Sequence, residues 1–171
     1  MIVINFFAGP GAGKSTCAAE LFAFMKKQGR KVELVTEYAK DLVYERTLKS
    51  ITQEKIFAEQ HWRVERLRGQ VDYVITDSPI LLSAIYKQDN PHWIEYVRDV
   101  FNSYDNFNVW VDRPESYMQH GRIQNKKEAK SLDQKILLEM VPNWTVDKAT
   151  LNCKHLLQAM SLTRKWREGQ E

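Results

Sequence analysis

Short apolar runs alternate with longer segments of helical periodicity along the chain. The runs are rich in β-branched and aromatic residues, which is typical of strands buried in a parallel sheet. Four runs and a fifth, shorter one in the sequence NWTV predict strands at residues 2–7, 31–36, 71–77, 106–113 and 143–146. The intervals between them leave room for the crossover helices that parallel strands require.

Within those intervals, apolar residues recur at spacings of three and four, the period of an amphipathic helix. Thr52 is a candidate N-cap, and Gly29 and Gly69 follow the last turns of the first two helices. Pro91 occupies the first turn of the third helix, where proline is tolerated. The pattern predicts helices at residues 14–28, 52–68, 91–104, 132–140 and about 148–160.

This order of elements predicts a three-layer α/β fold. A parallel sheet of about five strands would be covered by helices on both faces. The chain has 171 residues, with no internal repeat and no linker that would mark a second domain. We therefore predict one domain, residues 1–171.

Composition narrows the class of protein. The net charge of +3 is compatible with a polyanionic ligand, but it is lower than the net charge expected of a dedicated nucleic-acid-binding protein. The two cysteines, Cys17 and Cys153, have no metal-site spacing. The short apolar run at residues 2–7 has no charged leader, so we do not expect it to be a signal peptide. No apolar stretch approaches the roughly 18 residues of a membrane span. We expect a cytoplasmic protein without a membrane partner.

The loop after the first predicted strand is rich in glycine. Residues 8–15, AGPGAGKS, fit the phosphate-binding pattern G-x-x-x-x-G-K-[ST], except that Ala8 replaces the first glycine. Its position between a strand and a helix favours a P-loop over a plain turn, because the helix directs the positive end of its dipole at the phosphate. Lys14 can span the β- and γ-phosphates, Ser15 can bind Mg²⁺, and Thr16 can reach the α-phosphate. We predict that ATP or GTP, with Mg²⁺, binds Gly9, Gly11, Ala12, Gly13, Lys14, Ser15 and Thr16.

Two acidic residues follow predicted strands, at the sheet edge where α/β proteins bind ligands. Asp77, after YVIT, resembles a Walker B acid that holds Mg²⁺ or orients an attacking hydroxyl; the alternative is an acid capping the turn DSPI. Glu37 resembles the acid that accepts the substrate hydroxyl's proton in nucleoside kinases; the alternative is an acid favoured by a helix dipole. Two acids favour a hydroxyl acceptor, since a phosphate needs no base.

The helix at 52–68 carries groups suited to a nucleoside. It resembles the nucleoside-kinase helix that offers a glutamine to the edge of a base and an aromatic ring to its face. Gln60 is the candidate base reader, Phe57 the aromatic residue, and Arg63 a partner for a substrate phosphate or sugar. The alternative is a surface helix stabilised by the i,i+4 pair of Glu59 and Arg63.

Residues 113–130 are polar and basic, and Pro114 and Gly121 interrupt any regular pattern. This composition predicts a lid, whose guanidinium groups would stabilise the charge of a transferring phosphoryl group. Arg122 is the first candidate for this catalytic role and Arg113 the second. The alternative is a solvated basic loop.

Together these motifs resemble the small P-loop kinases of the ribosylnicotinamide-kinase-like group, which includes short AAA-type ATPases of bacteriophage genomes. The matching segments span most of the chain: FFAGPGAGKST, VTEYAKDL, the Gln60 helix, YVITDSP and HGRIQN…LDQKI. The resemblance implies a P-loop kinase fold, ATP and Mg²⁺. It also implies acceptors among nucleosides, nucleoside monophosphates, ribosylnicotinamide and hydroxymethylated bases in DNA. The chain departs from it at Ala8 and at DSP, where nucleoside kinases usually have an arginine after the acid.

The sequence therefore predicts a kinase that transfers the γ-phosphoryl group of ATP to a nucleoside- or nucleotide-type acceptor. Catalysis would rest on Lys14, Glu37, Asp77, Arg122 and Arg113. Two alternatives stay open. One is a kinase acting on a modified base in DNA, with salt-dependent binding. The other is an NTP-dependent switch or ATPase module that acts through a protein partner. The acceptor and the oligomeric state do not follow from the sequence.

Overall fold

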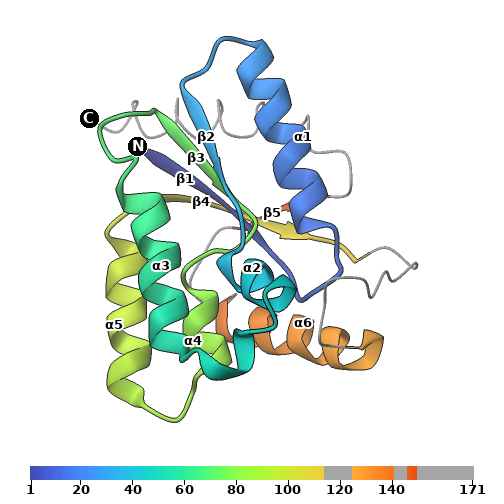
Figure 1. The fold of residues 1–171 in the computed structure, drawn as a ribbon. Helices are drawn as coiled ribbons and strands as arrows, with labels where there is room; N and C mark the ends of the chain where they lie inside the picture. The colour runs from blue at the N-terminus through green and yellow to red at the C-terminus, as the bar shows by residue number, and fades with distance from the viewer. Residues whose placement is uncertain (114–124, 141–145, 150–171) are drawn as a thin grey trace.

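Five parallel strands form the central sheet, in the spatial order β2-β3-β1-β4-β5 (Figure 1). The structure is a computed structural model that describes residues 1–113, 125–140 and 146–149. The strands are β1 (Ile2–Phe7), β2 (Val32–Val35), β3 (Tyr73–Thr76), β4 (Asp105–Val111) and β5 (Val146–Ala149). The all-parallel sheet confirms the predicted fold class.

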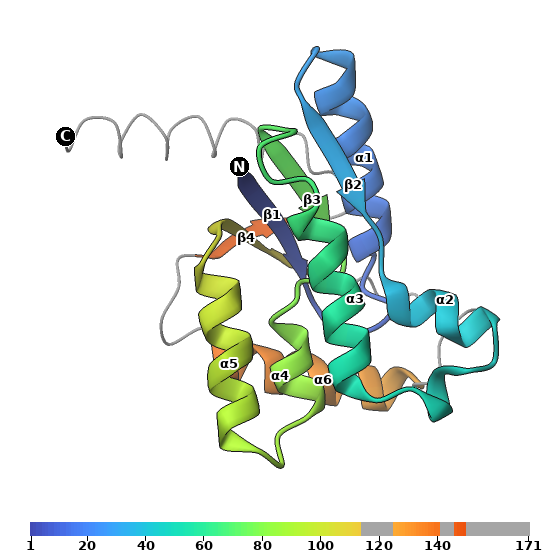
Figure 2. The same ribbon diagram turned by 60° about the vertical axis from the view of Figure 1, so that its left-hand side comes forward.

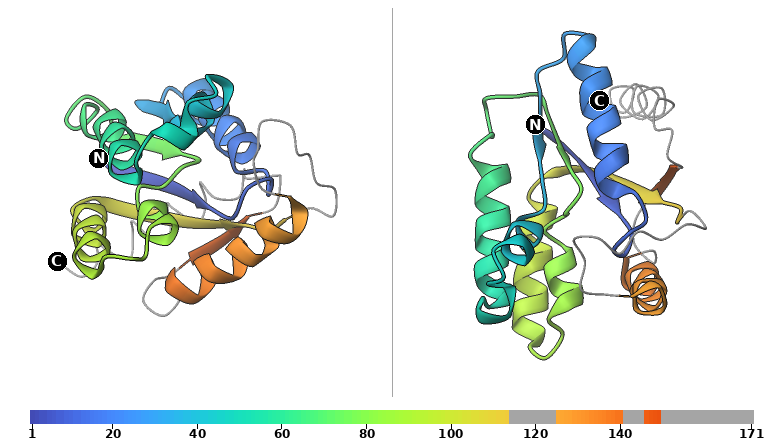
Figure 3. Two further views of the ribbon diagram at one scale, coloured as in Figure 1. Left: turned by 60° about the horizontal axis from the view of Figure 1, so that its bottom comes forward. Right: turned by 45° about the vertical axis from the view of Figure 1, so that its right-hand side comes forward.

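Helices cover both faces of this sheet. The helices of the described chain are α1 (Lys14–Lys27), α2 (Tyr38–Tyr44), α3 (Gln53–Glu65), α4 (Leu82–Tyr86), α5 (Pro91–Asn102) and α6 (Lys126–Met140), with a 3₁₀ turn at Leu48–Ser50. Helix α1 lies on one face, and α3 and α5 lie side by side on the other (Figures 2 and 3). Within the described part of the chain, no helix is long and apolar enough to span a bilayer.

The strand register brings the predicted site together. Asn5 of β1 is level with Thr76 of β3, and Thr76 is level with Val35 of β2. The chain therefore leaves all three strands at one edge, where α2, α4 and α6 also gather (Figures 1 and 2). Strands β1 and β3 are neighbours, but the chain leaves β1 toward α1 on one face of the sheet and leaves β3 toward α5 on the other face (Figure 2). Their carboxyl ends therefore form a topological switch point, where α/β proteins bind ligands.

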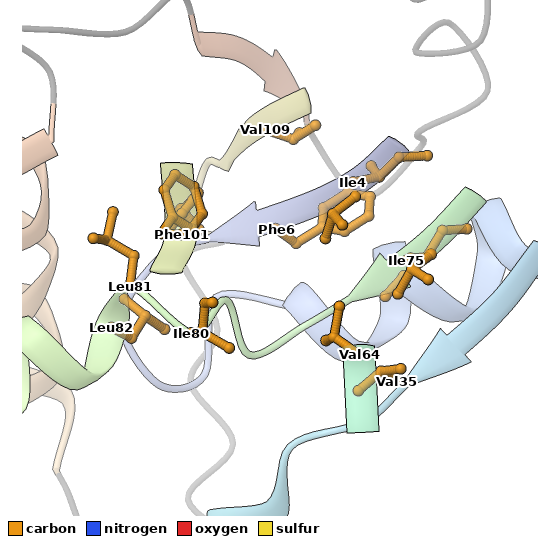
Figure 4. Close-up of a cluster of buried hydrophobic side chains, with 14 of the residues drawn as sticks. Ile4, Phe6, Val35, Val64, Ile75, Ile80, Leu81, Leu82, Phe101 and Val109 are labelled. Atoms are coloured by element: carbon orange, nitrogen blue, oxygen red, sulfur yellow. The ribbon is translucent and has the colours of Figure 1, made fainter. Parts of the chain in front are cut away.

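The first strand is the centre of the core, as its apolar run predicts. Ile4, Phe6 and Phe7 are fully buried, and Phe6 lies among side chains from neighbouring strands and helices (Figure 4). On α1 the buried residues recur at helical spacing, from Cys17 through Leu21 to Met25. A closely packed core of this kind holds the strand ends, and the loops that follow them, in fixed positions.

The predicted cap of α3 is confirmed, because the Thr52 hydroxyl accepts a hydrogen bond from the Lys55 N–H at 3.4 Å. The predicted start of α6 at residue 132 is wrong, since the helix begins at Lys126. A reciprocal capping box explains the earlier start: the Asn125 side chain accepts from the N–H of Lys127 and Glu128, and the Glu128 carboxylate accepts from the Asn125 N–H. Residues 126–130, predicted as part of an irregular lid, are therefore helical.

Two predictions near the C-terminus need correction. The fifth strand occupies Val146–Ala149, three residues later than the sequence pattern suggested, and residues 143–145 lie outside the described part. The helix predicted from about residue 148 is wrong at its start, because 148 and 149 pair with β4. Its remainder lies outside the described residues. Helices α2 and α4 were not predicted, since seven and five residues are too few to show a clear period.

Candidate active site

The glycine-rich loop connects β1 to α1 with a backbone that requires glycine. Gly11 and Gly13 have φ angles of 80° and 99°, in the left-handed region that other residues rarely adopt. Gly13 is also the N-cap of α1, and no acidic side chain lies in the first turn of that helix. The positive end of the helix dipole is therefore not neutralised from within α1, and it faces the loop where a phosphate would bind.

The loop lysine is held in place by the loop itself. Lys14 Nζ donates hydrogen bonds to the carbonyl oxygens of Ala8 at 2.9 Å and Gly9 at 3.1 Å. Removal from water lowers the pKa of Lys14, while the carboxylates of Glu37 and Asp77 act to raise it. The ammonium group is thus partly buried at the cleft, with both predicted acids near enough to influence its pKa.

A cleft of about 210 Å³ opens at this sheet edge. Six P-loop residues form one end of it, namely Pro10, Gly11, Gly13, Lys14, Ser15 and Thr16. Glu37 and Asp77 line the same cleft, so the loop and both acids converge as predicted. The other two predicted loop residues lie elsewhere: Ala12 is fully buried, and the N–H of Gly9 is directed away from the cleft, to Asp133.

Asp77 is suited to a cation. It is 3% exposed, and its Oδ1 receives no hydrogen bond from the described residues. A buried carboxylate oxygen without a donor is costly unless a cation or a proton satisfies it. Ser15, the other predicted Mg²⁺ ligand, lines the same cleft. Among the described residues there is no cluster of three or more acids, histidines or cysteines, but Mg²⁺ at nucleotide sites usually needs only one or two protein carboxylates.

Gln60 lines the cleft and also holds the backbone on either side of Glu37. Its Oε1 accepts from the N–H of Tyr38 at 3.0 Å, and its Nε2 donates to the carbonyl of Thr36 at 3.3 Å. The side chain is 3% exposed, so these two bonds are shielded from water. Sequence reasoning gave Gln60 a role toward a base and missed this contact with the loop that carries Glu37.

The other two predicted substrate-binding residues of α3 do not line the cleft. Phe57 packs against the rings of Trp93 and Tyr96 on α5, at centroid distances of 5.2 and 5.7 Å. Arg63 forms ion pairs with Glu59 at 2.9 Å and with Asp41 at 3.1 Å, so the predicted i,i+4 pair is confirmed. A role for Phe57 or Arg63 toward substrate stays a prediction.

Several cleft residues were missed by sequence reasoning. Gln53 and Ile56 share the face of α3 that carries Gln60, a spacing visible in the sequence but ambiguous without knowing which face is buried. The others come from the short α2, from the turn after it and from the segment around α4. They include Lys40, Val43, Leu48, Ile80, Leu82 and Tyr86.

The two candidate lid arginines have different outcomes. Arg122 lies outside the described residues. Arg113, just after β4, does not line the cleft; its guanidinium binds the carboxylate of Asp133 on α6 and the carbonyl of Pro10. A direct catalytic role for either residue stays a prediction.

The sheet order, the loop between β1 and α1 and the flanking helices are those of the P-loop kinase fold. A solved structure with this fold is a deoxyadenosine kinase from M. mycoides with bound dATP. The match has a TM-score of 0.54 and covers 96% of this chain and 99% of that one. At 16% sequence identity the likeness concerns the fold alone. No protein-family model and no curated protein sequence matches the chain.

Proposed function

We propose that the protein is a phosphotransferase that moves the γ-phosphoryl group of ATP or GTP to the hydroxyl of a nucleoside-type acceptor. The observation that carries this proposal is the convergence of the P-loop, Glu37 and Asp77 on one cleft. A nucleotide-binding switch needs the loop and a metal ligand, but it does not need a second acid beside an apolar pocket. The similarity to a deoxyadenosine kinase supports a nucleoside as the acceptor.

The phosphate end of the cleft would bind the nucleotide through its backbone and one side chain. The loop N–H groups and the N-terminus of α1 would hold the β-phosphate, and the Lys14 ammonium would stabilise charge that develops on the γ-phosphoryl oxygens. Ser15 and Asp77 would hold Mg²⁺, which supplies further neutralisation of phosphate charge when bound. These groups orient the phosphoryl group for attack.

The base would be Glu37. It lies at the N-cap of α2 and lines the same cleft as the phosphate loop. An acceptor hydroxyl held there would give its proton to the carboxylate as its oxygen attacks the γ-phosphorus, and the ADP or GDP leaves from the opposite side. Gln60 would serve this step by holding the backbone of Thr36 and Tyr38.

The acceptor end has an apolar wall suited to the face of a base. The apolar residues that line the cleft are Val43, Leu48 and Ile56, with Ile80 and Leu82 from the segment after β3, and we assign them to this end. Gln53 and Ser83 supply polar groups, joined by a hydrogen bond at 3.1 Å. An apolar pocket with a few fixed polar groups is the usual form of a small-molecule site.

A phosphoryl-transfer screen tests the proposal. Wild-type protein would be given γ-labelled ATP, Mg²⁺ and one acceptor at a time: nucleosides, nucleoside monophosphates, ribosylnicotinamide, and plain or hydroxymethylated DNA. We expect label on a nucleoside-type hydroxyl. Label on DNA alone would favour the kinase of modified bases, and ATP hydrolysis without any acceptor would favour an ATPase module.

The variant E37Q tests the base. We expect transfer to fall by on the order of 10²- to 10⁴-fold while ATP binding is retained, because the amide cannot take the proton. The matched control is E33Q, which removes a carboxylate from β2 that pairs with Lys26 on the surface. Unchanged transfer in E37Q would exclude Glu37 as the base.

A further inference from the structure

A nearly buried ion pair contacts the P-loop without lining the cleft. Arg113 Nε donates to Asp133 Oδ2 at 2.6 Å and Arg113 Nη2 to Asp133 Oδ1 at 3.0 Å, a bidentate geometry. The two side chains are 9% and 14% exposed. Pairs this shielded from water are screened little by salt, so the contact should persist at ionic strengths that weaken a surface ion pair.

Both members of this pair also bind the P-loop. Asp133 Oδ1 accepts from the N–H of Gly9 at 2.6 Å, and Arg113 Nη1 donates to the carbonyl of Pro10 at 2.7 Å. Arg113 Nη2 makes a longer bond to the carbonyl of Ala129 at 3.4 Å. One side chain just after β4 and one from α6 thus hold the peptide groups on either side of the Gly9–Pro10 bond in the phosphate loop.

The fit explains the glycine that follows Ala8. A Cβ on Gly9 would lie 2.6 Å from the carbonyl oxygen of Ala129 and 2.8 Å from Asp133 Oδ1. The Ala129 carbonyl belongs to a helix backbone and the Asp133 carboxylate is ion-paired, so neither group can move away from a Cβ at low energetic cost. Gly9 is therefore required by its contact with α6, whereas Gly11 and Gly13 are required by their φ angles.

The charges of the pair matter for a nucleotide. A carboxylate hydrogen-bonded to the P-loop would repel a triphosphate bound on the other side of that loop, and the Arg113 guanidinium neutralises it. Both charges reach the loop lysine: Asp133 acts to raise the pKa of Lys14 and Arg113 acts to lower it. Within the described residues, neither group touches the cleft itself.

We propose that Arg113 and Asp133 are positioning residues that set nucleotide affinity from behind the P-loop. Asp133 and Arg113 fix the Gly9–Pro10 segment, and Arg113 also cancels a negative charge that would otherwise oppose the phosphates. This inference rests on the nucleotide-binding half of the proposed function and is independent of the acceptor. The proposal predicts that removal of the Asp133 charge restores part of the ATP affinity that is lost when Arg113 is removed.

The experiment is a double-mutant cycle on the full chain, with ATP, ADP and AMP affinities measured by titration calorimetry in Mg²⁺. We expect R113A to weaken ATP binding by on the order of tenfold or more. D133N should change it by less than about threefold, because the amide oxygen still accepts the Gly9 N–H. The double variant R113A/D133N should bind ATP more tightly than R113A. The R113A defect should be smaller for AMP than for ATP, since repulsion scales with ligand charge.

Loss of packing alone predicts a different pattern. It would make the double variant as weak as R113A or weaker, with the same defect for all three nucleotides, and either result would overturn the inference. If thermal unfolding shows that R113A does not fold, R113K and R113Q replace it: R113K keeps the charge and should bind ATP more tightly than R113Q, and equal affinities would overturn the inference. A wild-type chain that binds no ATP would overturn both this inference and the proposed function. ATP binding without transfer to any acceptor would overturn only the proposed function.

Discussion

The two ends of the cleft are built in different ways. Residues 10–16 supply the phosphate end as one continuous segment, whose shape is set by glycine φ angles and by the start of α1. The other end, where we propose that the acceptor binds, is assembled from three separate elements, namely α2, α3 and the segment around α4. A site made from one segment can be recognised from a local sequence motif. A site assembled from several helices depends on which face of each helix lines the cleft, and that is not visible in a local motif.

Among the variants that compare the two ends, loss of the loop lysine should give the largest effect, and that effect should be confined to the phosphate end. In K14A we expect transfer to fall by on the order of 10²- to 10³-fold, because a donor aimed at the developing charge is removed. ATP affinity should fall as well, while the KM for the acceptor stays within about twofold of wild type. Steady-state kinetics with both substrates varied, and ATP titration, measure these quantities.

The control for K14A is K26A, a lysine at the other end of the same helix that pairs with Glu33 on the surface. It should leave transfer unchanged. An acceptor KM that rises in K14A as steeply as the rate falls would contradict the separation of the two ends.

The variant Q60L should give an intermediate effect that tells a backbone clamp from a base reader. Leucine leaves the Tyr38 N–H and the Thr36 carbonyl without their buried partner, at a cost of about 1–3 kcal/mol in stability. Displacement of Glu37 should lower kcat by roughly 10- to 10²-fold. We expect the same factor for every nucleoside that the wild-type protein accepts, measured by steady-state kinetics.

A base reader predicts another outcome for Q60L. The loss would then depend on the base, being large for nucleosides that pair with the amide and small for the others, and it would fall on the acceptor KM. R63A is a useful companion, because Arg63 is on the same helix but is engaged by Glu59 and Asp41. A raised acceptor KM in R63A would support the substrate role that the sequence suggested.

The contrast between the two ends also explains what the sequence could predict. Apolar runs bounded by glycine or acidic residues predicted the positions of four strands to within about two residues. The segment AGPGAGKST predicted the phosphate loop because all its functional groups lie in one short stretch of sequence. The packing of the Phe57 ring against Trp93 and Tyr96 could not be predicted, because these rings come from α5, more than 30 positions away in the sequence. The contact of Asp133 with Gly9 joins residues 124 positions apart, and no local period reports such a contact.

Adjacent residues of α3 allow the sharpest comparison, and the smallest effect on activity. Ile56 lines the acceptor end, whereas Phe57 is 3% exposed and packs on α5. In I56A the acceptor should lose part of an apolar contact, raising its KM about fivefold, or roughly 1 kcal/mol, with ATP affinity unchanged. In F57A the KM should change little while the free energy of unfolding falls by about 3–5 kcal/mol, measured by urea denaturation.

Each variant is the other's control, since the two positions share one helix turn and differ in the side they face. If F57A instead raises the KM and I56A mainly destabilises the fold, the ring is the base platform and the acceptor end lies on the α5 side of α3.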